Sequence, residues 1–274
     1  ELLILKYETF ENTLKEASKW RYGHTVDLEG YGTAALFNDP LIVIDPTDMN
    51  RNVGAALRLD KMAEFIQSAR NYLTSNNKKD YFYQVANKFA KDEILEEFQK
   101  RGSDLIAVKF NIPDIPLDTL HPQLRKTTES LAEKLNNEDF SVYQSDYWSD
   151  EENTAVLLFE MTVSRLNNTK IHYGPKVFVK RGSQNFIDKH GIENCYILDD
   201  FVVSKISREF VTASDFINYV LSYENISLIK VGKNLLDNII TSYELLSLDD
   251  LDLSNESFVT FLDDFLNPNK YLFR

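Results

Sequence analysis

The feature that most constrains this chain is a short apolar run that ends in Asp-Pro. Residues 41–44 read Leu-Ile-Val-Ile, and Asp45-Pro46 follows them directly. Isoleucine and valine favour a buried strand, and the proline ends it because it has no N–H to donate to a neighbouring strand. The polar residues that come next predict a turn: Asp48, Asn50, Arg51 and Asn52. After this turn, residues 53–56 are small enough to let the backbone pack closely against another element.

An amphipathic helix is predicted to follow, and Asp60 can cap its N-terminus. Its apolar positions recur at steps of three and four, which places them on one helix face: Leu59, Ala63, Ile66, the aliphatic stem of Arg70, and Leu73. Residues 40–73 therefore predict a buried strand, a polar turn and a packed helix, in that order.

This stretch resembles a segment of the archaeal, class I CCA-adding enzymes, which are CCA tRNA nucleotidyltransferases. Val43 to Asp48, two further residues, and then Arg51-Asn-Val-Gly-Ala-Ala-Leu57 are similar to the DP-x-D-x-x-RNVAA pattern of that family. Upstream, residues 1–10 and Trp20-Arg21 look like the end of a long helix and the tryptophan after it. Beyond residue 75 the resemblance thins to His172-Tyr-Gly174-Pro175 and the order of elements. It implies the end of the helical central domain, followed by the C-terminal body and tail domain.

The resemblance implies that the parent protein adds or repairs the 3′-terminal CCA of tRNA, using CTP, ATP and Mg²⁺. In the family, the arginine that matches Arg51 faces the incoming nucleotide and helps to read its base. Arg51 and Asn52 are therefore the candidate nucleotide-binding residues. From the residues alone, Arg51 can instead pair with Asp48 or Asp45 and only hold the turn. Asn52 can likewise cap a helix that starts at Val53, and Asp45 can fix the turn.

The carboxylates that nucleotidyl transfer requires are not found at the necessary spacing. The reaction needs Gly-Ser and, about ten residues later, two carboxylates on one strand that hold a Mg²⁺ pair. Neither Gly-Ser pair qualifies: Gly102-Ser103 precedes the widely spaced Asp114 and Asp118, and Gly182-Ser183 precedes the adjacent Asp199-Asp200. Asp250 and Asp252 have the spacing but lie in an acidic connector, which favours a solvated loop. The sequence predicts no catalytic residue and no metal ligand here, and places both in a missing N-terminal catalytic domain.

Charge is distributed unevenly along the chain. The sum of 43 acidic and 30 basic residues gives −13, although phosphate binding needs local positive charge. Residues 162–187 contain no acid, whereas residues 243–265 contain no Lys or Arg. We call residues 162–187 the basic stretch, and it supplies the candidate tRNA-binding residues: Lys170, His172, Lys176, Lys180 and Arg181. A solvated surface is the alternative interpretation. In the resembled family the C-terminal body and tail hold the outer arm of the tRNA, so that its 3′ end reaches the active site; the acceptor and T arm are therefore the expected partner.

The order of apolar patterns predicts an α+β fold in two domains. A polar run at residues 74–80 favours a division into domain 1–80, which would belong to the central nucleotide-binding domain, and domain 81–274. An ordinary loop between two helices is the alternative interpretation of this run. The predicted elements are helices at 2–20 and 81–99, a strand at 104–110, a helix at 122–136, strands at 140–148 and 154–163, a helix at 183–190, a strand within 195–210, and helices at 213–221, 235–246 and 257–266. The middle elements read β-α-β-β-α-β, which predicts a ferredoxin-like domain with extra C-terminal helices.

Composition excludes some classes of protein. No apolar run approaches the roughly 20 residues that span a bilayer, so no membrane partner is expected. The single cysteine agrees with a reducing cytoplasm. The chain begins inside a helical pattern, which suggests a truncated start, and we expect it to be inactive alone. A non-catalytic RNA-binding or protein-binding module with a ferredoxin-like fold remains the alternative function.

Overall fold

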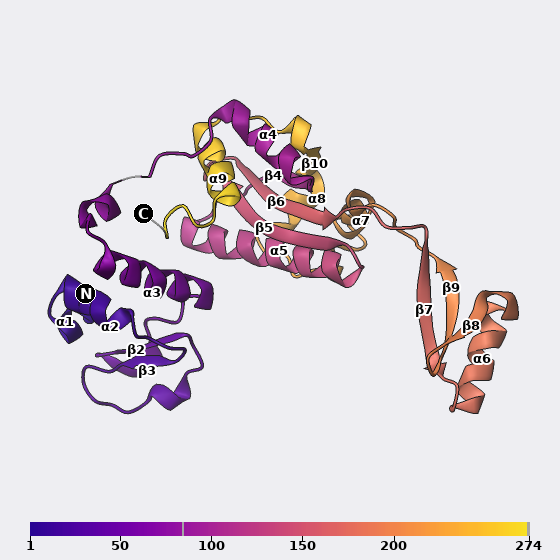
Figure 1. The fold of residues 1–274 in the computed structure, drawn as a ribbon, viewed down its shortest axis with the longest axis horizontal. Helices are drawn as coiled ribbons and strands as arrows, with labels where there is room; N and C mark the ends of the chain where they lie inside the picture. Colours follow the sequence, from indigo (N-terminus) through magenta and orange to yellow (C-terminus); the bar gives the residue numbers. More distant parts are fainter. Residues whose placement is uncertain (84, 273–274) are drawn as a thin grey trace. The chain divides into compact units, whose positions relative to one another are not determined.

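A computed structural model describes residues 1–83 and 85–272 of the chain. It contains two compact units (Figure 1): unit 1 comprises residues 1–88 and 267–274, and unit 2 comprises residues 89–266. The sequence predicted a division after residue 80, whereas the structural division follows Lys88. The C-terminal segment returns to unit 1, where the Asn71 side chain donates to the Leu272 carbonyl.

The N-terminal segment of unit 1 is broken into α1 (Leu2–Tyr7) and α2 (Phe10–Ala17). Between them Glu8 adopts φ 71°, a left-handed conformation that interrupts a helix. Thr9 then caps α2 by accepting a hydrogen bond from the Asn12 N–H at 3.1 Å. The prediction of one continuous helix over residues 2–20 was therefore wrong, because the cap at Thr9 starts a new helix.

The predicted strand is confirmed as β2 (Leu41–Asp45), the central strand of a three-stranded sheet. It pairs in parallel with β1 (His24–Val26) and antiparallel with β3 (Asp48–Asn52). The chain segment that joins β1 to β2 contains η1 (Ala34–Leu36). The predicted turn over residues 48–52 was wrong, because these residues form β3. The reversal is confined to the Asp45–Asp48 corner.

Helix α3 (Leu59–Thr74) covers this sheet, and η2 (Lys78–Phe82) follows it. Its N-cap is Arg58, whose Nε lies 2.8 Å from Oδ1 of Asp60, so Asp60 is a first-turn residue rather than the cap. The predicted apolar face was right for Ile66 and Leu73, which are partly buried against the core of unit 1, and wrong for Leu59, Ala63 and Arg70, which are exposed. The fully buried residues of α3 are Met62, Ala69 and Tyr72, and they lie in one apolar cluster with Leu14 of α2, Trp20 and Val43 of β2.

Unit 2 contains a four-stranded antiparallel sheet with the order β10-β4-β6-β5. Its elements are β4 (Asp104–Asn111), α5 (Leu117–Asn137), β5 (Ser141–Ser149), β6 (Thr154–Val163), α7 (Ala213–Val220), α8 (Leu236–Ser242) and β10 (Glu244–Ser247). Along the chain these elements read β-α-β-β-α-α-β. Two helices, α7 and α8, take the place of the second helix of the β-α-β-β-α-β pattern, and the fourth strand lies beside the first. The ferredoxin-like α+β fold is thereby confirmed.

The second half of that fold is not the one predicted. The fourth strand is β10, which lies at the end of a segment predicted as helix, because Leu245 and Leu246 pair with Val108 and Ala107 of β4. Helix α6 (Lys180–His190), η3 (Ile192–Asn194) and strand β8 (Cys195–Leu198) instead belong to a separate part of unit 2. In this part β8 pairs with β9 (Phe201–Ser207), and β9 pairs with β7 (Thr169–Lys176), which gives a three-stranded sheet of order β7-β9-β8. Strand β7 was not predicted.

Both faces of the four-stranded sheet are covered by helices, as Figure 1 shows for α5 on one face and α4 and α9 on the other. In β6, Leu157 and Phe159 pack with α5, α7 and α8, whereas Val156 and Leu158 pack with α4 (Lys91–Arg101) and α9 (Glu256–Leu266). Burial on both faces explains the nearly continuous apolar run in β6. In the described part of the chain, no helix is both long and apolar enough to cross a bilayer.

Helix α4 begins ten residues later than the helix predicted from residue 81. Its buried residues Ile94 and Phe98 were predicted correctly, but Phe82 is exposed. Residue 84, which falls within the predicted helix, lies outside the described residues. The later start is set by Glu93, whose carboxylate accepts a hydrogen bond from the Ala90 N–H at 2.8 Å.

Candidate nucleotide-binding and RNA-binding surfaces

Arg51 lies on β3 with 67% of its side chain exposed. Its Nη1 is 3.5 Å from Oδ2 of Asp45, so the pair that the residues alone suggested is present. Exposed pairs of this kind contribute little to stability, and the guanidinium remains open to solvent. The guanidinium of Arg51 is therefore paired weakly through Nη1, and its other N–H donors face solvent.

Asp45 is held in place mainly by the turn. Its Oδ1 accepts hydrogen bonds from the N–H and the Oγ1 of Thr47, each at 2.8 Å. These bonds are the main reason why the pKa of the Asp45 carboxyl is lowered, and Arg51 makes a smaller contribution. The interpretation of Asp45 as a turn-fixing residue is supported by this geometry.

Asn52 is buried, with 8% of the residue exposed, and its amide is used within the hairpin. Its Oδ1 accepts hydrogen bonds from the N–H groups of Val43 and Gly54, each at 2.8 Å. Its Nδ2 donates to Oδ2 of Asp39 at 2.8 Å and to the Leu41 carbonyl at 3.0 Å. Residues 53–56 form turns, so the idea that Asn52 caps a helix there was wrong. Asn52 fixes the strand that carries Arg51.

Gly54 allows the hairpin to close against β2. A Cβ atom at this position would lie 2.8 Å from the Leu41 carbonyl oxygen, which is closer than real Cβ atoms approach. Two hydroxyls from the loop before β2 hold the other side: Tyr31 donates to the Pro46 carbonyl at 2.7 Å and Thr33 to the Met49 carbonyl at 2.6 Å. The support of Arg51 is therefore rigid, and no pattern in the sequence indicated these two hydroxyls.

The predicted tRNA-binding residues are divided between β7 and α6. Lys180 and Arg181 open α6, whose first turn carries no acidic side chain. Cations are disfavoured by the dipole at a helix N-terminus, so helix stability does not account for them. Lys176 is already paired, with its Nζ 2.7 Å from Oδ2 of Asp200 and 5.3 Å from the ring centre of Phe201.

The remaining two residues lie in different surroundings. His172 packs on α6, with its ring centre 5.5 Å from that of Phe186 and 5.1 Å from that of His190. The pKa of His190 is lowered, mainly by desolvation and then by His172 and Lys189. Lys170 lines a cavity of about 260 Å³ together with Lys134 and Arg208. The five residues thus form no single cluster.

The register of the three-stranded sheet brings together two tyrosines that lie far apart in the sequence. Tyr173 and Tyr196 both lie opposite Val203, so all three occupy one sheet face. Both tyrosines are exposed, as is Ile171 on the same face. Tyr196 was missed because it lies outside the basic stretch and only strand pairing places it beside Tyr173.

Asp250 and Asp252, which have the spacing of metal ligands, are hydrogen-bonded within local turns. Asp250 accepts from the N–H and Oγ of Ser247, and Asp252 accepts from the N–H and Oγ of Ser254. These bonds are the main cause of the lowered pKa of both carboxyls. Among residues 1–83 and 85–272, no three His, Cys, Asp or Glu side chains are grouped to hold a metal ion. The described residues therefore do not fit a Mg²⁺ site.

Comparison with known proteins gives two family matches and a consistent set of relatives. The family described as "CCA-adding enzyme, C-terminal domain" matches residues 101–248, and "tRNA nucleotidyltransferase, second domain" matches residues 1–83. The CCA-adding enzyme of Methanothermobacter thermautotrophicus is 38% identical over 100% of this chain and 60% of its own length. That of Methanosarcina mazei is 33% identical over 96% and 57%.

The CCA-adding enzyme of Methanosarcina barkeri is 37% identical over 78% of the chain and 47% of its own length. The chain therefore spans between about half and three-fifths of the length of these relatives. The family matches cover both described units, and the residues that carried the sequence resemblance lie inside them. On this evidence the chain belongs to the CCA-adding enzyme family.

Proposed function

We propose that the protein containing this chain adds or repairs the 3′-terminal CCA of tRNA from CTP and ATP in the cytoplasm. In this proposal unit 1 contacts the incoming nucleotide through Arg51, and the β7–α6 region of unit 2 holds the acceptor and T arm. The Mg²⁺ ligands come from another part of the protein, since the described residues bring no suitable carboxylates together. The observation that carries the proposal is the exposed guanidinium of Arg51 on a rigid hairpin.

Arg51 suits this role because its position is fixed and its donors are open. A guanidinium presents a planar set of N–H donors that cannot be deprotonated near neutral pH. Asn52 is proposed to act in nucleotide binding as a positioning residue, because its side-chain amide is already hydrogen-bonded to Val43, Gly54, Asp39 and Leu41. The hairpin can thereby present the guanidinium to a base edge without reorganising.

The alternative, a stand-alone RNA-binding module, has less support in this fold. RNA-binding modules that use an open four-stranded sheet stack bases on one exposed face. Here both faces of the four-stranded sheet are covered by buried apolar clusters. RNA contact is therefore left to β7, α6 and the exposed face that carries Tyr173 and Tyr196.

The test is nucleotide addition by the full-length protein to a tRNA that lacks its CCA end. We expect Arg51→Ala to lower kcat/KM for CTP and ATP about ten- to hundredfold, because a hydrogen bond to a charged group contributes about 1.5–3 kcal/mol. Arg58→Ala is the matched control, since Arg58 lies in the same unit and pairs with Asp60 at 2.8 Å.

A different outcome would support the ion-pair interpretation of Arg51. In that case Arg51→Ala would lower the unfolding midpoint while the folded enzyme kept its kinetics. Measuring kcat/KM and the midpoint on the same preparation separates the two roles. We also expect the chain of residues 1–274 alone to incorporate no nucleotide, and Mg²⁺-dependent incorporation by it would contradict the proposed location of the carboxylates.

A further inference from the structure

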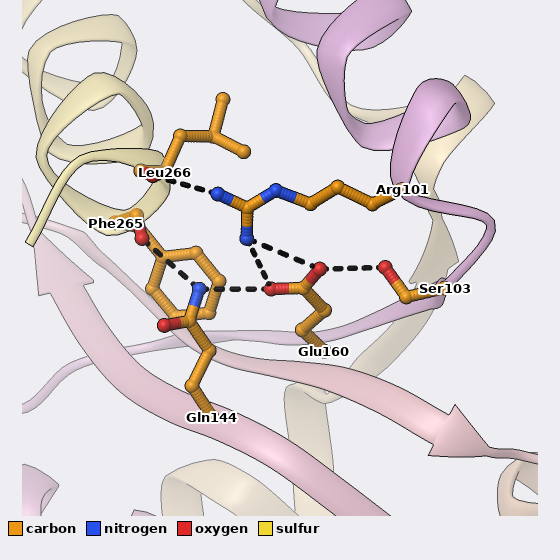
Figure 2. A network of polar contacts seen from close by, with 6 residues as sticks. All are labelled: Arg101, Ser103, Gln144, Glu160, Phe265 and Leu266. Carbon is orange, nitrogen blue, oxygen red and sulfur yellow. Dashed lines mark hydrogen bonds and ion pairs between the residues drawn. The ribbon is translucent and has the colours of Figure 1, made fainter.

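Glu160 is the acidic residue of the apolar strand β6, and it is 1% exposed. Figure 2 shows its carboxylate surrounded by donors from neighbouring elements. Arg101 Nη1 donates to its two oxygens at 3.0 and 3.3 Å, Ser103 Oγ at 2.6 Å, and Gln144 Nε2 at 2.8 Å. A buried carboxylate is costly unless it is paired and hydrogen-bonded, and this one is both.

The same donors extend to the end of α9. Arg101 Nη2 donates to the Leu266 carbonyl at 2.6 Å, and Gln144 Nε2 donates to the Phe265 carbonyl at 3.0 Å. The last carbonyls of a helix have no donor within the helix itself. Backbone capping is restricted here because Pro268 has no N–H. Side chains anchored on Glu160 therefore close the last turn of α9 (Figure 2).

This turn lies where the chain passes between the two units. The chain enters unit 2 at Phe89 and leaves it after Leu266. The Phe89 N–H donates to Oδ1 of Asp263 at 2.9 Å, and Asp263 is a fully buried residue of the last turns of α9. Both passages are thus bonded to the same helix end.

We infer that Arg101, Gln144 and Glu160 are positioning residues that hold the last turn of α9 closed and thereby fix both passages of the chain. The role in catalysis rests on the proposed function: nucleotide contact is assigned to unit 1 and tRNA contact to unit 2. A loosened α9 end would then reduce productive alignment of the two substrates without weakening tRNA binding.

The test compares Arg101→Lys with Ser103→Ala in the full-length protein. Lysine keeps a positive charge beside Glu160, but its single ammonium does not reproduce the fork that also reaches the Leu266 carbonyl. Ser103 bonds Glu160 but takes no part in the bonds to α9 drawn in Figure 2, so it is the matched control. Hydrogen–deuterium exchange is followed in peptides covering residues 86–92 and 262–268.

We expect Arg101→Lys to raise exchange of the last α9 turn and of Phe89 together, by about tenfold, the effect of losing one charged hydrogen bond. Ser103→Ala should leave both peptides unchanged even if its unfolding midpoint falls. Equal increases in the two variants, or an increase in α9 without Phe89, would overturn the inference. Gln144→Leu removes the donor to Phe265 and repeats the test should Arg101→Lys fail to fold.

Steady-state kinetics of nucleotide addition test whether these residues act in catalysis. For tRNA lacking CCA, we expect Arg101→Lys to lower kcat while KM for tRNA stays unchanged, and Ser103→Ala to match the wild type. Unchanged kcat together with raised exchange would overturn the positioning role. If the wild-type protein adds no nucleotide at all, the proposed function fails, while the exchange measurement still decides whether α9 is anchored in this way.

Discussion

The two sheets of unit 2 differ in how their faces are covered. The four-stranded sheet is buried on both faces, and its strand β6 is almost entirely apolar. The three-stranded sheet is covered by α6 on one face, where a Cβ on Gly174 would lie 2.6 Å from the Phe186 ring. Its other face exposes Ile171, Tyr173 and Tyr196.

This difference separates stability from recognition. Apolar area removed from water stabilises the four-stranded sheet, because buried apolar clusters cover both of its faces. The three-stranded sheet buries less and keeps aromatic and basic side chains accessible. Surfaces of the second kind are where binding residues are expected, because they can exchange water for a partner.

The largest expected effect is on the free energy of unfolding, when one aromatic residue in each sheet is replaced by alanine. Phe159 is 0% exposed, and we expect Phe159→Ala to lower the free energy of unfolding by about 3–5 kcal/mol. Tyr173 is 57% exposed, and Tyr173→Ala should change it by no more than about 0.5 kcal/mol. Denaturant unfolding of the two variants measures this contrast. Similar losses would show that the three-stranded sheet is not the less buried one in solution.

An intermediate effect is expected on tRNA affinity. Lys180→Ala and Arg181→Ala should each weaken binding of all tRNAs and flatten the slope of log affinity against log salt by about 0.7–0.9. Lys176→Ala should have a smaller effect, because Asp200 already neutralises this lysine at 2.7 Å. Fluorescence anisotropy between about 50 and 200 mM salt measures the slope.

Asp249→Asn is the control for charge, because Asp249 lies in the acidic segment on η5 (Leu248–Asp250) of unit 2. We expect it to change neither affinity nor slope. If the variants Lys170→Ala, Lys176→Ala, Lys180→Ala and Arg181→Ala combined in one protein also bind tRNA as the wild type does, the basic stretch is a solvated surface.

The smallest effect concerns pH and involves His190 at the end of α6, the helix that covers the three-stranded sheet. The pKa of His190 is lowered in the fold, so the unfolded chain takes up a proton at a higher pH than the folded one. The associated stability is complete above the unfolded pKa of about 6.5 and is lost as the pH falls through the lower, folded value. His190→Phe keeps the ring contact with Phe186, whose centre is 4.4 Å away, but does not titrate.

We therefore expect the unfolding midpoint of the wild type to fall more than that of His190→Phe between pH 7.5 and pH 5.5, measured by circular dichroism. His172 and Lys189 remain in both proteins and serve as a shared background. Parallel pH dependences would mean that His190 is not the group that titrates.

The sequence by itself determined the family and the elements with strong local patterns. Strands β2, β4 and β6 and helices α5, α7 and α9 were predicted because each buries a continuous or periodic set of apolar residues. The arginine of the hairpin was also identified from its motif, and its exposure agrees with the proposed role. These features depend on neighbours in the chain.

Only the tertiary structure decided the features that depend on distant partners. Strand β10 exists because Leu245 and Leu246 pair with β4, far back in the chain. Strand β7 has no clear apolar alternation in its sequence and is a strand because it pairs with β9. Asn52 is buried because its amide completes the bonds of β2. Glu160 is an anchor because three side chains from separate segments bond to it: Arg101 of α4, Ser103 and Gln144 of β5. Long-range pairing leaves no local periodicity, which is the physical reason why these residues could not be assigned from sequence.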